Sequence, residues 1–167
     1  MSRAFVKESD DDLVAGELPE RPLPEHVNYV TPKGLELLQA RVRELTERHE
    51  LLKREADENS EARQKLRETE RDLRYFNAQL ERATPVDTAD QPRDRVHFGA
   101  IVRIEDERGA EQEFSLVGDD EADVASGRIS WASPLARALI GAKVGDSVNW
   151  HRPAGDTEIY IVDIRYP

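Results

Sequence analysis

Two runs of residues at helical spacing, between Pro32 and Pro85, constrain the fold more than any other feature of this sequence. Each run advances in steps of three and four residues, which is the a/d pattern of a coiled-coil helix. The members of the first run are Leu35, Leu38, Val42, Leu45, His49, Leu52 and Ala56. The members of the second are Ala62, Leu66, Thr69, Leu73, Phe76 and Leu80. Four polar residues, 57–60, separate the runs and are poor choices inside a helix. We therefore expect an antiparallel helical hairpin over residues 29–84.

The expected helix ends place a group of acids at the turn of this hairpin. Thr31 is a good N-cap and Pro32 suits the first helical position, so the first helix should run from there to about Ala56. Ser60 can cap the second helix, which should reach about Arg82. Four carboxylates then lie at or beside the turn, namely Glu55, Asp57, Glu58 and Glu61. A solvated turn explains such a cluster by pattern alone, and a metal-directed role is the alternative.

The second helix also carries a row of basic residues, which are Arg63, Lys65, Arg67, Arg71 and Arg74. Acidic residues are interleaved with them, so surface pairing between positions i and i+4 is the favoured interpretation. A patch that faces RNA or a protein partner is the alternative. His49 lies in the apolar seam, where a single histidine usually packs while partly exposed.

The segments on either side of the hairpin differ from it in composition. Residues 1–28 are rich in acidic side chains and proline and poor in apolar ones, which predicts a disordered acidic tail. Residues 85–95 contain several proline and aspartate residues and should form a linker. The chain is therefore expected to divide into a tail, a hairpin, a linker and a second domain.

Residues 96–167 show the alternation of apolar and polar residues that is typical of β-strands. Strands are expected at residues 96–104, 112–117, 128–131, 147–151 and 158–166. Tyr160, Val162, Ile164 and Tyr166 should share one face of the last strand. A short helix should begin after Ser133 and end before Gly141. An antiparallel sheet of about five strands with one helix makes this an α+β domain.

The composition disfavours several classes of function. The formal net charge of −11 argues against duplex DNA as a direct partner. Without cysteine there is no disulfide, thiolate zinc site or cysteine nucleophile, and the four histidines lack metal-ligand spacing. The chain contains no apolar run long enough for a transmembrane helix and starts without a signal peptide, so a cytoplasmic protein is expected.

The segment SPLARALIGAKVGDSV, residues 133–148, resembles the signature of the bacterial Gre family of transcript-cleavage factors. The order of parts is similar throughout, with Thr31 and Gly34 before the hairpin, Val86-Asp87 after it, and Phe98-Gly99-Ala100 opening the sheet. The resemblance covers residues 29–167. It implies a coiled-coil hairpin followed by a C-terminal domain with an FKBP-like fold.

The resemblance also implies a partner and a mechanism. In that family the C-terminal domain docks at the rim of the secondary channel of RNA polymerase, and the hairpin enters the channel. Acidic tip residues help to hold a second Mg²⁺ for cleavage of backtracked RNA, and carboxylates suit this hard cation. The chain would then be no enzyme and would hold no cofactor of its own, with nascent RNA contacted only indirectly. Arg137, Pro134 and Asp146 become candidate contacts with the polymerase.

The tip departs from the family pattern Gly-Asp-x-x-Glu-Asn-x-Glu-Tyr. Glu58, Asn59 and Glu61 match it, Glu55 stands where the aspartate belongs, and the glycine and tyrosine are missing. The first helix is also expected to be about two turns, or ~10 Å, shorter than in the cleavage factors. A monomer that promotes RNA cleavage is one interpretation, and a channel-occupying competitor or modulator is another. A chaperone-like module whose hairpin grips a different protein is a third.

A prolyl isomerase is disfavoured by the sequence. An FKBP-like fold does not by itself carry that activity. No aromatic-lined pocket for proline is evident from the spacing of the aromatic residues.

Overall fold

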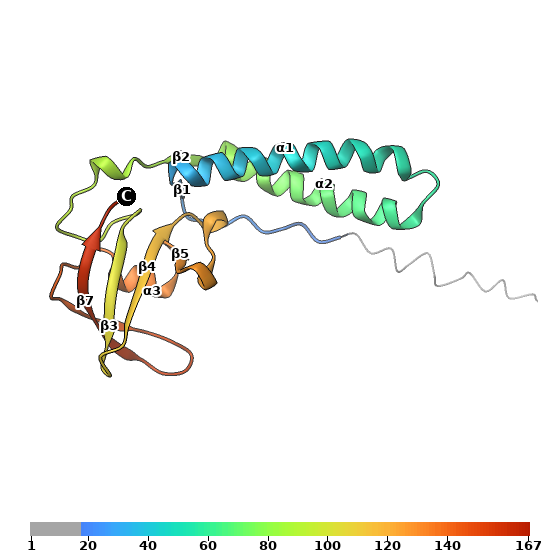
Figure 1. Ribbon diagram of the computed structural model, residues 1–167. Helices are drawn as coiled ribbons and strands as arrows, with labels where there is room; N and C mark the ends of the chain where they lie inside the picture. The colour runs from blue at the N-terminus through green and yellow to red at the C-terminus, as the bar shows by residue number, and fades with distance from the viewer. Residues whose placement is uncertain (1–17) are drawn as a thin grey trace, which may run out of the picture.

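A helical arm and a curled sheet form the two parts of the computed structural model, which describes residues 18–167 (Figure 1). Helices α1 (Pro32–Glu55) and α2 (Ser60–Glu81) run antiparallel, and their turn lies at the end of the arm away from the sheet. At a rise of ~1.5 Å per residue, the 24 residues of α1 span roughly 36 Å. The predicted hairpin is confirmed. No helix in this part of the chain is both long and apolar enough to cross a membrane.

The two helix starts are fixed by side-chain caps. The Thr31 hydroxyl accepts a hydrogen bond from the Gly34 N–H at 2.9 Å, as the predicted start of α1 requires. Helix α2 is capped by Asn59, whose Oδ1 accepts from the Glu61 N–H at 2.9 Å. The prediction that Ser60 caps α2 is wrong, because the amide one residue earlier reaches the free N–H groups and Ser60 becomes the first helical residue.

The seam between the helices is built from the predicted positions. Leu38, Leu45 and Leu52 are buried along α1. His49 lies in the same row, half-buried, with its Nε2 3.1 Å from Glu70 Oε1 on α2. On α1 the seam is therefore apolar except at His49, whose imidazole faces the partner helix.

Replacing His49 with leucine is expected to stabilise the protein by about 1 kcal/mol. The His49 side chain is only 21% exposed, so a leucine there adds apolar burial to the seam. Urea denaturation measures the change, and Arg48→Leu, at an exposed neighbouring position, serves as the control. A loss of stability in His49→Leu would show that the contact with Glu70 outweighs the added burial.

Two three-residue strands close the base of the hairpin and were not predicted. Strand β1 (Asn28–Val30) pairs in parallel with β2 (Ala83–Pro85). The buried Asn28 side chain donates to the Gln79 carbonyl at 2.7 Å, which ties β1 to the end of α2. Strands this short show no periodicity in the sequence, so neither could be recognised from it.

Residues 18–27, here called the strap, lie along α2. Both the Glu20 carboxylate oxygens accept from the Arg74 side chain, and the Arg21 guanidinium lies 3.9 Å from the centre of the Tyr75 ring. Composition predicts disorder up to residue 28, whereas the structure places the strap against α2 through contacts of its charged side chains. The rest of the predicted tail, residues 1–17, lies outside the described residues.

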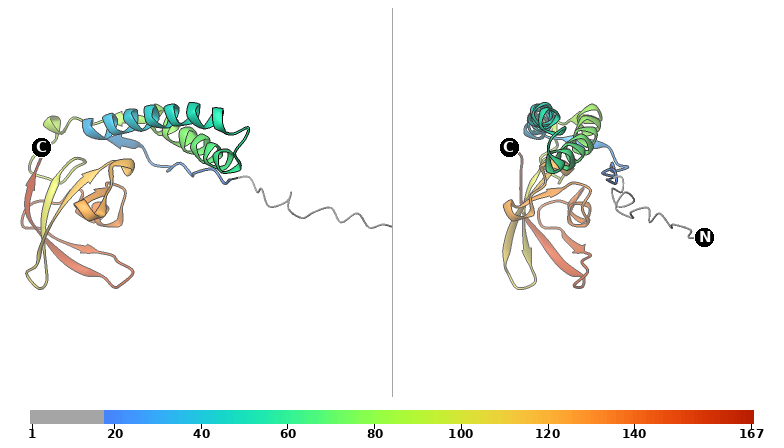
Figure 2. Two further views of the ribbon diagram at one scale, coloured as in Figure 1. Left: turned by 45° about the vertical axis from the view of Figure 1, so that its right-hand side comes forward. Right: turned by 90° about the vertical axis from the view of Figure 1, so that its right-hand side faces the viewer.

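The sheet has five strands in the order β5-β4-β3-β7-β6 and is strongly curled (Figure 2). The strands are β3 (Ile101–Asp106), β4 (Glu111–Val117), β5 (Arg128–Ser130), β6 (Ser147–Trp150) and β7 (Thr157–Arg165). Helix α3 (Pro134–Leu139) follows β5 and packs against the sheet. The predicted α+β domain is confirmed.

The sheet is mixed, and the expectation of a purely antiparallel one is wrong. Strand β5 pairs in parallel with β4, because the chain between them does not make a hairpin turn. It passes instead through the short 3-10 helices η3 (Asp119–Glu121) and η4 (Val124–Ser126) and turns back to pair with the last three residues of β4, Ser115–Val117. Residues 96–100, expected as strand, form a buried loop that leads into β3.

A β-bulge in β7 changes which residues face the core. Ile104 pairs with Ile161 while Arg103 pairs with Asp163, so Val162 is the extra residue. Ile159 and Ile161 are buried before the bulge, and Tyr160 is 40% exposed. The prediction that Tyr160 shares a face with the last residues of the strand is wrong, because the bulge shifts the alternation by one residue.

Candidate functional site

The turn between α1 and α2 carries all four predicted acids. Glu55 is the last residue of α1, Asp57 and Glu58 lie in the turn, and Glu61 lies in the first turn of α2. All four side chains are exposed. Lys65 Nζ lies 2.5 Å from Glu61 Oε1, and this hydrogen bond lowers the pKa of the Glu61 carboxyl. Among the ion pairs of residues 18–167, none involves the other three acids, so their carboxylates are available to a partner.

Arg63 holds the backbone of this turn. Its Nη1 donates to the Ala56 carbonyl at 2.9 Å and lies 3.5 Å from the Asp57 carbonyl oxygen. These carbonyls follow the end of α1, where backbone oxygens lack helical partners. The sequence assigned Arg63 to the row of surface-pairing residues, whereas in the structure it positions the tip acids. Nothing in the spacing of the row distinguishes it from the other basic residues.

Of the other four residues of the basic row, three pair in different ways, and Arg67 makes no ion pair within residues 18–167. Lys65 makes the expected i,i+4 pair with Glu61. Arg71 binds its sequence neighbour, and Arg74 binds Glu20 of the strap. The prediction of regular surface pairing along α2 is therefore correct at one position, and a segment outside the hairpin supplies the partner at another.

An apolar groove of about 650 Å³ opens on the sheet domain beside the start of α3. Its apolar lining comes from Phe114, Ile129, Pro134, Leu135 and Trp150. The sequence did not reveal this aromatic-lined groove, because Phe114 on β4 and Trp150 on β6 are distant in the chain and meet only in the folded sheet.

The three residues predicted to contact a polymerase do not share one site. Pro134 lines the groove, while Arg137 and Asp146 are exposed outside it. Asp146 Oδ2 accepts from the Lys143 N–H at 2.9 Å and so closes a turn. The structure thus places Pro134 where an apolar partner can bind and gives Asp146 a structural role.

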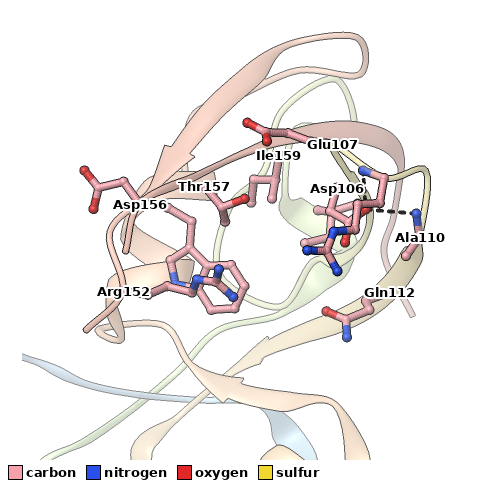
Figure 3. Close-up of a pocket in the computed structure, with 11 residues that line it drawn as sticks. Asp106, Glu107, Ala110, Gln112, Arg152, Asp156, Thr157 and Ile159 are labelled. Carbon is pink, nitrogen blue, oxygen red and sulfur yellow. Dashed lines mark hydrogen bonds between the residues drawn. The ribbon is translucent and has the colours of Figure 1, made fainter. Parts of the chain in front are cut away.

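A second, charged cavity of about 500 Å³ adjoins the groove and shares Gln112, Trp150 and Arg152 with it. Figure 3 shows Arg152 and Asp156 on one side of this cavity and Asp106 and Glu107 on the other. The Arg152 guanidinium lies 5.1 Å from the centre of the Trp150 ring. An apolar floor with a charged rim is typical of protein–protein interfaces.

Side chains able to ligate a metal do not gather into a site of their own. Among residues 18–167, no group of three or more His, Cys, Asp or Glu side chains is arranged to hold a metal ion. The four tip carboxylates are exposed to solvent. Together, the arm with its exposed acids and the grooved sheet define a class of protein in which a small sheet domain carries a projecting helical hairpin.

Comparison with known proteins identifies the family within that class. The family model described as "Transcription elongation factor, GreA/GreB, C-term" matches residues 91–166. Transcription elongation factor GreB of Neisseria meningitidis serogroup B is 37% identical over 153 residues, which cover 83% of this chain and 94% of the relative. GreB of Pseudomonas aeruginosa is 34% identical over 151 residues, with coverage of 83% and 90%. The chain belongs to the GreA/GreB family of transcription elongation factors.

Solved structures of related proteins are also similar. GreA factor homolog 1 (Gfh1) of Thermus thermophilus has 26% identity and a TM-score of 0.40, covering 84% of this chain and 99% of that chain. A GreA/GreB elongation factor from Nitrosomonas europaea has 25% identity and a TM-score of 0.41, covering 83% and 98%.

Proposed function

We propose that this protein binds RNA polymerase and regulates transcript elongation, with its sheet domain at the rim of the secondary channel and its arm inside. The observation that carries the proposal is the set of three exposed carboxylates at the end of a roughly 36 Å arm, none of them in an ion pair within the described part of the chain. Membership of the GreA/GreB family supports the polymerase as the partner. The protein then acts in the cytoplasm as a monomeric accessory factor and contacts nascent RNA only through the polymerase.

The tip acids are proposed to act on the polymerase's own Mg²⁺. Glu58 and Glu55 are the main candidates, with Asp57 beside them, because these carboxylates have no competing ion pair with any residue from 18 to 167. Mg²⁺ is commonly bound through one or two carboxylates together with phosphate oxygens and water. Glu61 is held by Lys65 and is proposed to support the charge of the tip instead of ligating the metal.

The groove is proposed as the docking site for the polymerase. Phe114 and Trp150 supply aromatic walls, and such residues are frequent anchors of protein interfaces. Pro134 lies in the same groove, and the exposed Arg137 and Asp146 are proposed as contacts outside it. Docking through the sheet leaves the arm free to enter the channel.

A cleavage assay on backtracked elongation complexes tests the role of the tip. The wild-type protein is expected to accelerate RNA shortening, and Glu58→Gln and Glu55→Gln are each expected to reduce that acceleration about tenfold, or ~1.4 kcal/mol. Glu47→Gln, an exposed acid on α1 away from the turn, serves as the matched control and should keep full activity. Equal activity in all three variants would contradict the metal-directed role.

A second candidate function is occupation of the channel without cleavage. Two observations favour it: the family's tip glycine and tyrosine are replaced by Arg54 and Ala62, and Ala62 is buried in the seam. In that case the protein binds the polymerase, shortens no RNA and inhibits a true cleavage factor. A protein that does not bind polymerase at all would contradict both mechanisms and favour the chaperone-like alternative.

A further inference from the structure

The short turn η3 (Asp119–Glu121) joins the sheet domain to the base of the arm through three consecutive acids. Asp120 contacts α2: the Tyr75 hydroxyl donates to its Oδ1 at 2.8 Å, and the Gln79 amide donates to its Oδ2 at 2.9 Å. Gln79 is fully buried. Burial and the hydrogen bond to Asp120 raise the pKa of Tyr75 to about 12. Both carboxylate oxygens of Asp120 thus accept hydrogen bonds from α2.

Glu121 contacts the other helix. The Thr31 hydroxyl, which caps α1, donates to Glu121 Oε2 at 2.5 Å. Glu121 is 9% exposed, and a buried carboxylate is retained only where it is hydrogen-bonded. The approach is close, since a Cβ on Gly34 would lie 2.7 Å from Glu121 Oε2. The positive end of the α1 dipole favours a carboxylate here.

Asp119 contacts the strap. Its Oδ2 lies 2.6 Å from His26 Nε2, and its Oδ1 accepts from the Ser130 hydroxyl at 2.5 Å within the sheet domain. The edge of the His26 ring packs on Trp131, with 5.3 Å between the ring centres. Each of the three acids therefore binds a different segment at the base of the arm. Asp119 binds the strap, Asp120 binds α2, and Glu121 binds the cap of α1.

We infer that Asp120 and Glu121 are positioning residues that fix the direction of the arm relative to the docking face of the sheet. The contacts of this turn with α1, α2 and the strap restrain the base of the arm at three places. A tilt of about 10° at the base would move the tip of an arm of roughly 36 Å by about 6 Å. Ligation of Mg²⁺ requires distances near ~2.1 Å, so the tip tolerates no such displacement. The functional part of this inference rests on the proposed function, and the geometric part does not.

Distance measurement between spin labels tests the geometric part without a polymerase. The sequence has no cysteine, so Lys53→Cys near the tip and Arg108→Cys in the β3–β4 turn provide unique labelling sites on exposed residues. We expect one narrow distance distribution in the parent and a distribution at least twice as wide in the double variant Asp120→Ala/Glu121→Ala. A distribution that stays narrow would overturn the inference.

Three further variants separate positioning from general stability. Asp123→Ala, in the same acidic loop but bonded only within the sheet domain, should leave the distribution narrow. Glu121→Gln keeps an acceptor for Thr31 and should restore most of the narrow distribution. Gly34→Ala favours the helix by propensity but displaces the Glu121 carboxylate, so it should broaden the distribution without weakening α1. Broadening in Asp123→Ala equal to that in the double variant would contradict a specific role of the turn.

The polymerase assay then tests the functional part. Asp120→Ala/Glu121→Ala should bind RNA polymerase within about twofold of the wild type, because the groove is unchanged. Its acceleration of RNA shortening in backtracked complexes should be at least fivefold smaller than that of the wild type. Failure of the wild type to bind polymerase would contradict the proposed function alone, whereas full tip activity in a variant with a broadened distribution would contradict the positioning role.

Discussion

Replacing Leu45 with alanine is expected to lower the free energy of unfolding by about 3 kcal/mol. Leu45 is 1% exposed and lies in the middle of the seam between α1 and α2. The substitution removes apolar contacts and leaves a cavity between two helices that are held by one apolar row. Urea denaturation followed by helical circular dichroism measures the loss directly.

Leu51→Ala is the matched control for this prediction. Leu51 is on the same helix but 58% exposed, so the same change of side chain should cost less than about 0.5 kcal/mol. If the two variants lose equal stability, the seam does not hold the arm together in the way the structure indicates. Binding of the sheet domain to polymerase should persist in Leu45→Ala, because the groove lies outside the arm.

The arm could be predicted from the sequence because its information is local and repeated. The row from Leu38 through Leu45 to Leu52 specifies a helix with one apolar face, and the polar break specifies the reversal. Thr31 and Pro32 mark the start of α1 for the same local reason. The tip acids follow from that geometry, since any residue between the two helices must lie at the turn.

The contacts of the turn η3 with the base of the arm, and the position of the strap, could not be predicted. They depend on single polar pairs between segments that are distant in the sequence. His26 and Asp119 are 93 residues apart, and Thr31 and Glu121 are 90 residues apart. A polar pair of this kind leaves no periodic pattern, and each acid alone reads as part of a solvated loop. The parallel pairing of β5 was missed for a related reason, since it depends on the path of the loop before it.

The groove could be predicted from the sequence only in part. The sequence predicts the strands that carry Phe114 and Trp150, but not that both residues line one groove, since β3 and β7 lie between β4 and β6 in the sheet. The curl of the sheet and the position of α3 leave this side partly uncovered. A candidate interface therefore emerges only once the strand order is known.

Replacing Trp150 with alanine is expected to weaken binding to RNA polymerase about 30-fold, or ~2 kcal/mol. Trp150 lines both the apolar groove and the charged cavity beside it, and Arg152 lies against its ring. A large aromatic residue at the centre of an apolar patch with a charged rim has the features of an interface anchor. The affinity is measured by titrating labelled protein with purified core polymerase at fixed ionic strength.

Two variants make this result specific to the groove. Tyr160→Ala removes an exposed aromatic ring that does not line the groove, and it should change the affinity less than twofold. Trp150 also packs against the core, so Trp150→Phe is included as a variant that keeps an aromatic wall, and it should recover most of the affinity. Equal loss in Tyr160→Ala and Trp150→Ala would place the docking surface elsewhere on the sheet. Unchanged affinity in a folded Trp150→Ala protein would exclude the groove as the anchor, whereas a selective loss places the polymerase on the same domain whose acidic turn directs the arm.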